Sequence, residues 1–254
     1  MSIQLRKLVV RASGLAVLLA TAAALAYVLP AVSILRRVVE KRDDLRLNTV
    51  EVKGTMSLPP PYAAEAGQAL SIPGDREVQA TAAIQLKLPG RCRLEVTVPE
   101  GGRSVSVLSQ GKRRTEGAEL VAASQALSQA CPLLAFRSRA EGEARADVER
   151  HLRKLGVDTK VTGLGRFDGK IVYVIGSQRP DAPQLWIYKD SFQPARVLYT
   201  DEGTRWDVRF RNFGSPVTGD AFPRIVEVAR GEDLLMRFTA LEANTRAPLA
   251  DSLF

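Results

Sequence analysis

The stretch AIQLKLPGRCRLEVTV, residues 83–98, carries the strongest fold signal in the chain. In its second half the apolar residues Cys92, Leu94, Val96 and Val98 alternate with polar ones. Successive side chains of a β-strand point to opposite faces of the sheet, so this period of two places the four apolar residues on one face. Alternation of this kind predicts an antiparallel sheet with one face buried and the other in water.

The same two-residue period recurs on both sides of this stretch. Strands are expected over residues 48–58 and 77–88, and a short strand and turn over residues 103–117. The segment 170–176 is apolar on both faces, which predicts a central strand. The remaining strands are expected as a hairpin over 184–200 turning at Asp190 and Ser191, a strand over 204–213, and a hairpin over 224–244 turning at Gly231–Asp233.

Three segments change to helical spacing. Residues 31–46 carry apolar side chains three and four positions apart, with charged residues opposite, as in an amphipathic helix. Residues 117–136 and 142–158 show the same spacing, and Gly156 is a typical end for the last of these helices. The segment 59–75 is expected to be a loop, because it starts with three prolines that cannot donate ladder hydrogen bonds.

The order of these elements is helix, strands, two helices and strands again. Runs of strands interrupted by helices, without βαβ alternation, indicate an α+β domain with an antiparallel sheet. A long sheet that is apolar on one face needs a cover, and the helices are the available covers. We therefore expect a curved sheet with helices lying across its apolar face.

The three glycines of GLGRFDG, residues 163–169, raise the question of a phosphate-binding loop. Such loops need GxxxxGK[ST] or GxGxxG spacing that leads into a helix. Here the expected strand 170–176 follows directly, and Asp168–Gly169 is a favoured turn pair. The glycines therefore predict a hairpin turn between two strands.

The N-terminus predicts export. Three basic residues within the first eleven are followed by an uncharged stretch of 24 residues, Ala12 to Leu35. Cleavage after Ala26, in the small-x-small pattern of residues 24–26, would remove a signal peptide; without cleavage the stretch is long enough to anchor the chain in a membrane. We expect residues 1–26 to be this signal or anchor and residues 27–254 to be a single exported domain.

The chain is basic, with a net charge of +8, and this raises the question of nucleic acid as a partner. Residues 1–26 hold three basic residues and no acidic ones, so their removal would lower the net charge to +5. The remaining arginines are scattered and form no dense basic block, as on an ordinary solvated surface. We therefore expect no nucleic-acid partner.

Catalytic and metal-binding patterns are missing from the sequence. His151 is the single histidine, and it lies in a charged helical segment where a surface or boundary position is expected. Nucleophile triads need a base held beside the nucleophile, and zinc sites need several Cys or His ligands at set spacing. We therefore expect no enzyme activity, no catalytic residues, no metal and no cofactor.

The two cysteines, Cys92 and Cys131, fall on an apolar strand face and on an apolar helix stripe. An exported protein sits where disulfides persist. If the helix packs on that strand face, the two cysteines are able to pair; otherwise they are two separate buried thiols. The sequence leaves both alternatives open, because the geometry decides between them.

Several weak motifs in the right order resemble the LolA-like periplasmic carriers of lipoproteins and lipids, over about residues 31–254. The first, residues 34–58, resembles the family's first helix and first strand, and residues 83–113 resemble its strand, basic-proline element, strand and turn. The others are residues 184–197, with Trp186 and Pro194 in the expected places, residues 208–213 and 222–228 as the last strands, and residues 244–254 as the tail.

The resemblance implies an unclosed antiparallel β-barrel with helices across its mouth. It implies a periplasmic monomer that binds lipoprotein acyl chains or phospholipid without chemistry and exchanges them with inner- and outer-membrane partner proteins. The candidate lipid-binding residues are the one-sided apolar residues of strands and helices, with plain core packing as the alternative for each: Leu94, Val96, Leu127, Leu133, Leu134, Phe136, Trp206, Val208 and Phe210.

One position departs from the family pattern. Carriers of this family that hand lipoproteins onward have a basic residue directly before the proline, and here Leu88 precedes Pro89. A relative that binds or senses other lipids fits the sequence equally well. A second reading is an envelope protein-interaction module on the same fold, possibly held at the inner membrane. A filled interior would favour this second reading, and a lipid-sized cavity the first.

Overall fold

The computed structural model describes residues 28–254 except residues 100, 139 and 141. The expected export signal or anchor, residues 1–26, therefore lies outside the described residues. In the described part, no helix is long and apolar enough to cross a membrane.

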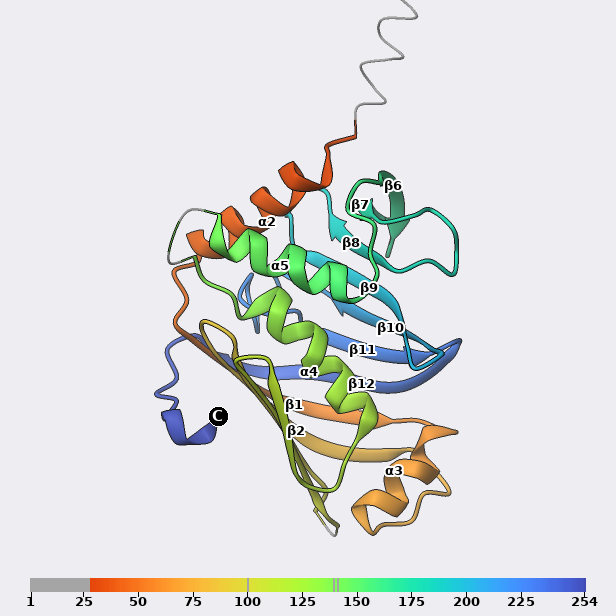
Figure 1. The fold of residues 1–254 in the computed structure, drawn as a ribbon. Coiled ribbons are helices and arrows are strands. Elements are labelled where there is room, and N and C mark those ends of the chain that lie inside the picture. Colours follow the sequence, from red (N-terminus) through yellow and green to blue (C-terminus); the bar gives the residue numbers. More distant parts are fainter. Residues whose placement is uncertain (1–27, 100, 139, 141) are drawn as a thin grey trace, which may run out of the picture.

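The chain forms one twelve-stranded antiparallel sheet in the order β5-β4-β3-β2-β1-β12-β11-β10-β9-β8-β7-β6 (Figure 1). Every neighbouring pair is consecutive in sequence except β1 and β12, which join the two halves of the sheet. The end strands β5 and β6 do not pair with each other, so the sheet is not closed. The strands are β1 Thr49–Leu58, β2 Val78–Lys87, β3 Arg91–Thr97, β4 Arg103–Ser109, β5 Lys112–Gly117, β6 Thr162–Phe167, β7 Lys170–Ile175, β8 Gln184–Tyr188, β9 Pro194–Asp201, β10 Thr204–Arg211, β11 Ile225–Arg230 and β12 Asp233–Asn244.

Helices cover the concave face of this sheet (Figure 1). Helix α4, Val121–Leu134, contacts β3 and β4 in one half and β10, β11 and β12 in the other. Helices α2, Ala31–Asp44, and α5, Glu143–Lys154, pack on each other at one end of the molecule, and α5 also packs on α4. The expected α+β fold with an unclosed antiparallel sheet under helices is confirmed.

Helix α4 crosses the sheet because the chain leaves it at one edge and re-enters it at the other. After β5 the chain runs through α4 and α5 to β6, the opposite edge strand. The face of α4 that meets the sheet is rich in alanine, which lets a helix approach closely, and its buried polar groups are paired. Ser124 and Ser106 share a 3.2 Å hydrogen bond, and the Tyr199 hydroxyl donates to Gln125 Oε1 at 2.6 Å.

The segment 59–75 is not the loop that its prolines predict. It contains helix α3, Tyr62–Leu70, which follows directly after Pro61. Proline is tolerated at the start of a helix, where its missing N–H has no partner to lose. The next residues are mostly alanine and other helix formers, and four of the helix's apolar side chains are buried in the core: Tyr62, Ala63, Ala66 and Leu70.

Strand β7 is also placed differently from its sequence pattern. It is apolar on both faces, yet it lies next to the edge strand β6 instead of at the centre. Its concave-facing Tyr173 and Ile175 join the main core, whereas Val172 and Val174 join a second small cluster on the outer face with Phe167, Tyr188 and Ala195. The Asp168–Gly169 turn between β6 and β7 is confirmed, and both residues have positive φ.

A disulfide joins the sheet to its cover. Cys92 of β3 and Cys131 of α4 form this bond, with their Cα atoms 5.8 Å apart and a sequence separation of 39. Both residues are buried. The pairing that the sequence left open is therefore present in the structure, and it holds the C-terminal half of α4 against the concave face.

We expect the double variant Cys92→Ala, Cys131→Ala to lose about 4 kcal/mol of unfolding free energy, because the bond restricts a 39-residue loop in the unfolded chain. Urea unfolding monitored by Trp fluorescence measures the difference. The wild-type protein under reducing conditions is the control and should show the same loss. Equal midpoints for oxidised and reduced wild-type protein would contradict the stabilising role.

Candidate functional site

The nine candidate lipid-binding residues meet on the concave face, beneath the covering helices. Leu94 and Val96 come from β3, Trp206, Val208 and Phe210 from β10, and the others from α4 or just after it. Each is at most 7% exposed, and all belong to one hydrophobic cluster. Side chains of α4 occupy the space over the sheet, so these residues pack against one another in this structure.

Three of the nine also line an open cleft of about 220 Å³ at the C-terminal end of α4. We call it the phenylalanine cleft, because Phe136, Phe192 and Phe213 line it together with Leu133 and Leu134. The remaining lining residues come from α2 and the residue after it, from the β8–β9 turn and the first residue of β9, and from the loop after β10: Val38, Lys41, Arg42, Asp44, Leu45, Asp190, Ser191, Gln193, Pro194 and Asp220. The cleft is thus an apolar opening into the main core with charged residues at its rim.

Phe192 is held in the cleft by an unusual backbone. Its φ is +55°, a left-handed conformation that bulky residues rarely adopt. The turn is held by Phe192 N–H donating to the Tyr188 carbonyl at 2.9 Å, and Tyr188 N–H donating to the Gln193 carbonyl at 2.9 Å. The ring stacks on Tyr173 with 5.9 Å between centroids. Strained residues of this kind cluster at functional sites, so Phe192 marks the cleft as a candidate.

A second cleft, of about 400 Å³, lies beside the first. We call it the arginine cleft, because Arg42, Arg46 and Arg137 line it, with Asp43 as its one acidic residue. Its apolar walls are Leu47, Leu88 and Phe136. Arg42 and Phe136 line both clefts. Leu88, the residue that departs from the family pattern, therefore faces the arginine cleft.

The sequence did not lead us to predict Arg42 or Phe192 as site residues, for different reasons. Arg42 follows Val38 by four positions and Val39 by three, so its spacing already placed it on the buried stripe of α2. Phe192 carries no such signal, because it lies in a turn and only the folded turn directs its ring into the cleft.

His151 lies at a contact between two helices. Its Nε2 lies 2.9 Å from Oε1 of the buried Gln129, which joins α5 to α4. Burial, and then the positive charge of Lys154, lower its pKa to about 4. The histidine is thus a neutral, half-buried residue at the boundary between two helices, as expected.

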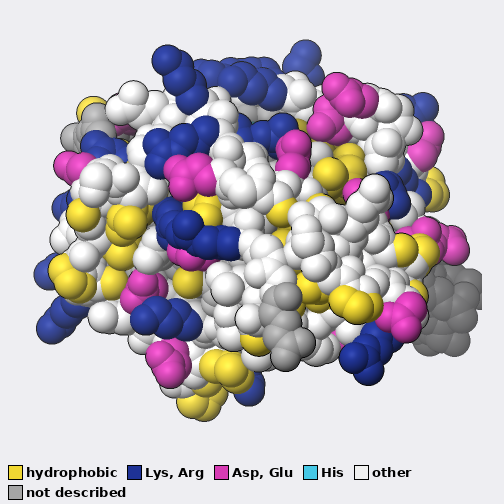
Figure 2. Space-filling model, turned by 90° about the horizontal axis from the view of Figure 1, so that it is seen from below, with side chains coloured by type: hydrophobic (Ala, Val, Ile, Leu, Met, Phe, Trp, Pro, Cys, Tyr) yellow, Lys and Arg dark blue, Asp and Glu magenta, His cyan; other side chains and the backbone are white. Residues whose placement is uncertain are grey.

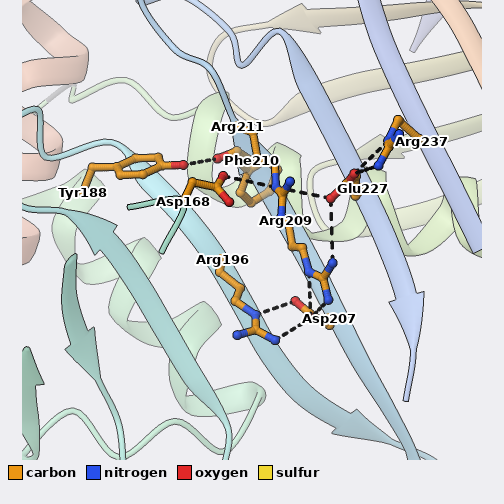
Figure 3. Close-up of polar contacts among 9 residues, drawn as sticks. All are labelled: Asp168, Tyr188, Arg196, Asp207, Arg209, Phe210, Arg211, Glu227 and Arg237. Carbon is orange, nitrogen blue, oxygen red and sulfur yellow. Dashed lines mark hydrogen bonds and ion pairs between the residues drawn. The ribbon is translucent and has the colours of Figure 1, made fainter. Parts of the chain in front are cut away.

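The outer face of the sheet carries a buried ion-pair network (Figure 3). Asp207 accepts paired hydrogen bonds from Arg196, at 2.8 and 2.6 Å, and from Arg209, at 2.9 and 2.7 Å. Glu227 pairs with Arg237 at 2.7 Å and with Arg211 at 3.3 Å. Burial alone would raise the pKa of Asp207, but the hydrogen bonds from Arg196 and Arg209 outweigh it and lower the pKa. Asp207 is therefore held as an anion by its arginines, which suits a structural role better than proton transfer.

Charges on the surface are interspersed. On the face seen in Figure 2, Lys and Arg side chains are spread widely and many lie beside Asp or Glu. In the described part of the chain, no three His, Cys, Asp or Glu side chains gather as a candidate metal site.

No family model matches the chain. No curated protein matches it in sequence. Its structure is similar to a LolA superfamily protein, NE2245, from Nitrosomonas europaea, with a TM-score of 0.47, 14% identity, and coverage of 89% of this chain and 98% of that one. This neighbour is a member of the family that the sequence resembles.

Two further solved structures are similar. A DUF1329 family protein from Desulfovibrio piger has a TM-score of 0.49 and 12% identity over 89% of this chain and 97% of that one. An outer membrane lipoprotein-sorting protein domain from Vibrio parahaemolyticus has a TM-score of 0.45 and 9% identity over 85% and 93%. Likeness at this level concerns the fold, and the function has to be argued from the residues of this chain.

We expect Asp207→Asn to lose about 3 kcal/mol of unfolding free energy, because it leaves two arginines without their buried counter-ion. Urea unfolding at neutral pH measures this loss. The control is Glu116→Gln, whose ion pair with Arg114 is exposed; its loss should stay within about 1 kcal/mol.

Comparing the wild type with Asp207→Asn at different pH values gives a second test. Because the folded pKa of Asp207 is lowered, its stabilising effect is present above the unfolded pKa of about 3.9 and is lost as the pH falls through the folded value. The wild-type advantage over Asp207→Asn should therefore be constant from neutral pH to about pH 5 and shrink below about pH 4. An advantage that already disappears near pH 6 would contradict this assignment.

The single histidine allows a direct titration of the α4–α5 contact. We expect the imidazole protons of His151 in a tag-free protein to titrate near pH 4 by NMR, instead of near the ordinary value of about 6.5. Since the folded state keeps the imidazole neutral, its stability is complete above about pH 6.5 and falls as the pH decreases toward 4. His151→Gln should remove that slope from the stability profile, and a titration midpoint near 6.5 would contradict the buried contact.

Proposed function

We propose that the protein is a non-enzymatic carrier that binds an acyl chain of a lipoprotein or another lipid at the phenylalanine cleft. The observation that supports this most is an apolar opening, lined by three phenylalanines, that leads into the main core beside α4. Each CH₂ group removed from water contributes about 0.8 kcal/mol, so a site of this kind binds a chain without any catalytic group.

The size of the cleft bears on how a chain enters. About 220 Å³ is below the roughly 300–1,000 Å³ of ordinary small-molecule sites, so a long chain would need additional room. The disulfide restrains α4, because Cys131 lies three residues before Leu134. The walls that this disulfide does not restrain are α2 and the β8–β9 turn. In this proposal the nine candidate residues form the floor that the chain reaches when these walls separate.

The setting of the carrier is part of the same proposal. We place it in the periplasm as a monomer, with residues 27–254 as one lipid-binding domain, exported by residues 1–26 or held by them at the inner membrane. Inner- and outer-membrane proteins would then be its donor and acceptor.

A second candidate function is an envelope sensor or protein-interaction module. It is favoured by the filled concave face, where all nine candidate residues pack in one hydrophobic cluster. In that case the clefts remain closed to lipid and the surface of the covering helices provides the contacts. Binding of an uncharged chain separates the two functions.

We expect a fluorescent long-chain alcohol to bind the wild-type protein, and Phe192→Asn to weaken this binding at least about tenfold. Asparagine tolerates the left-handed backbone at this position, so the change removes the ring and keeps the turn. Burial of a Phe side chain is worth about 1.5–3 kcal/mol, which corresponds to roughly ten- to hundredfold. Fluorescence titration measures both affinities.

The matched control is Leu241→Asn, which removes an apolar side chain that is 57% exposed on β12 and does not line the phenylalanine cleft. It should leave the affinity unchanged. Failure of the wild-type protein to bind the alcohol would reject the carrier function and favour the interaction module. Equal affinity for wild type and Phe192→Asn would move the site elsewhere.

A further inference from the structure

Arg42 is a buried cation without a complete set of partners. Arg42 as a whole is 7% exposed, and its Nη1 donates to the Ala221 carbonyl at 2.6 Å. Its Nε and Nη2 are also buried, and the described residues offer neither of them a hydrogen-bond acceptor. Burial lowers the pKa of Arg42 to about 10, with Asp43 acting in the opposite direction, so the group remains charged at neutral pH.

A buried charge with unpaired donors destabilises the folded protein when no ligand is bound. A buried charge is ordinarily paired and hydrogen-bonded, because its transfer from water is unfavourable. A buried guanidinium with free donors is therefore suited to an anion supplied from outside the chain. Arginine presents several N–H groups in one plane, which match the oxygens of a carboxylate or a phosphate.

The neighbourhood of Arg42 decides on which side an anion fits. The arginine cleft brings Arg46 and Arg137 to the same place, opposed by Asp43, whose Oδ1 already accepts the Ser138 N–H at 3.2 Å. The guanidinium of Arg137 is hydrogen-bonded to the uncharged Asn48, which leaves its charge uncompensated by that partner. The arginine cleft thus carries an excess of positive charge.

The phenylalanine cleft has the opposite character at its rim. Its three acidic residues, Asp44, Asp190 and Asp220, outnumber its two basic ones, Lys41 and Arg42, and the remaining walls are mainly apolar. An anion is disfavoured in this cleft, whereas an alkyl chain is favoured. Because Arg42 and Phe136 line both clefts, a molecule with an anionic head and an apolar tail is able to occupy the two clefts at once.

We propose that Arg42 recognises the anionic head, a carboxylate or a phosphate, of an amphiphile whose head lies in the arginine cleft and whose chain lies in the phenylalanine cleft. This inference rests on the proposed acyl-chain site and adds the chemical class of the ligand. Arg46 and Arg137, both exposed, attract the head, and Arg42 forms the buried contact.

The test compares oleate with oleyl alcohol, which have the same chain and differ in head charge. Hydrogen bonds to a charged group are worth roughly ten- to hundredfold in affinity, so wild-type protein should prefer oleate by at least about tenfold. Arg42→Met keeps much of the side-chain volume and removes the charge; it should bind both ligands equally. Arg42→Lys keeps the charge and should retain part of the preference.

The matched control is Arg36→Met, the same substitution at an exposed position of α2. It should keep the preference for oleate. Thermal unfolding checks that Arg42→Met is folded: its midpoint should be equal to that of the wild type or higher, because it lacks a buried charge. Oleate should raise the midpoint of the wild type but not of Arg42→Met.

Two further probes identify the source of the anion. Lysophosphatidic acid should share the preference shown for oleate, whereas inorganic phosphate alone should produce little stabilisation. Stabilisation of the wild type by inorganic phosphate with none by oleate would overturn an amphiphile as the ligand and indicate a free anion.

Equal affinities for oleate and oleyl alcohol, or a preference that survives in folded Arg42→Met, would overturn the role of Arg42 and leave the proposed acyl-chain site standing. If neither lipid binds, the proposed function fails, and this inference fails with it.

Discussion

A twelve-stranded open sheet with one apolar face has to cover that face, and here a single helix does most of the covering. Helix α4 reaches both halves of the sheet because the chain leaves at β5 and re-enters at β6. Its alanine-rich face allows close approach, and the Cys92–Cys131 disulfide holds it there. Helix α5 packs on α4 and helix α2 packs on α5, so these two helices extend the cover at one end of the molecule (Figure 1).

The same packing explains where the candidate site lies. Over most of the concave face the side chains of α4 occupy the space that a ligand would need. At the C-terminal end of α4 the cover changes to α2 and the β8–β9 turn, and there the phenylalanine and arginine clefts open side by side. In the proposed carrier function, α2 and this turn are the walls that would have to separate, because α4 is covalently restrained.

Buried charges are paired differently on the two faces of the sheet. On the outer face, Asp207 and Glu227 are each paired with arginines (Figure 3). Arg211 Nε and Glu227 Oε2 are buried without a hydrogen bond, but they face each other as an ion pair at 3.3 Å, so their charges are compensated within the chain. On the concave side, Arg42 is buried with two donors that the described residues leave free. This contrast separates a structural ion-pair network from a group suited to an external anion.

Much of the fold followed from the sequence by itself, because a strand has a period of two and the alternation in residues 83–98 and 204–213 leaves one face apolar wherever the strand lies. Local rules also predicted the Asp168–Gly169 turn and the end of α5 just before Gly156. They failed for α3, where three prolines outweighed the helix formers after them, and for β7, whose second apolar face is buried by an outer cluster that no local pattern reveals. The clefts were decided by tertiary structure alone: Arg42, Phe136 and Phe192 are far apart in sequence, and only the packing of α2, α4 and the β8–β9 turn brings them together, because a cleft is a property of the surfaces that several elements leave between them.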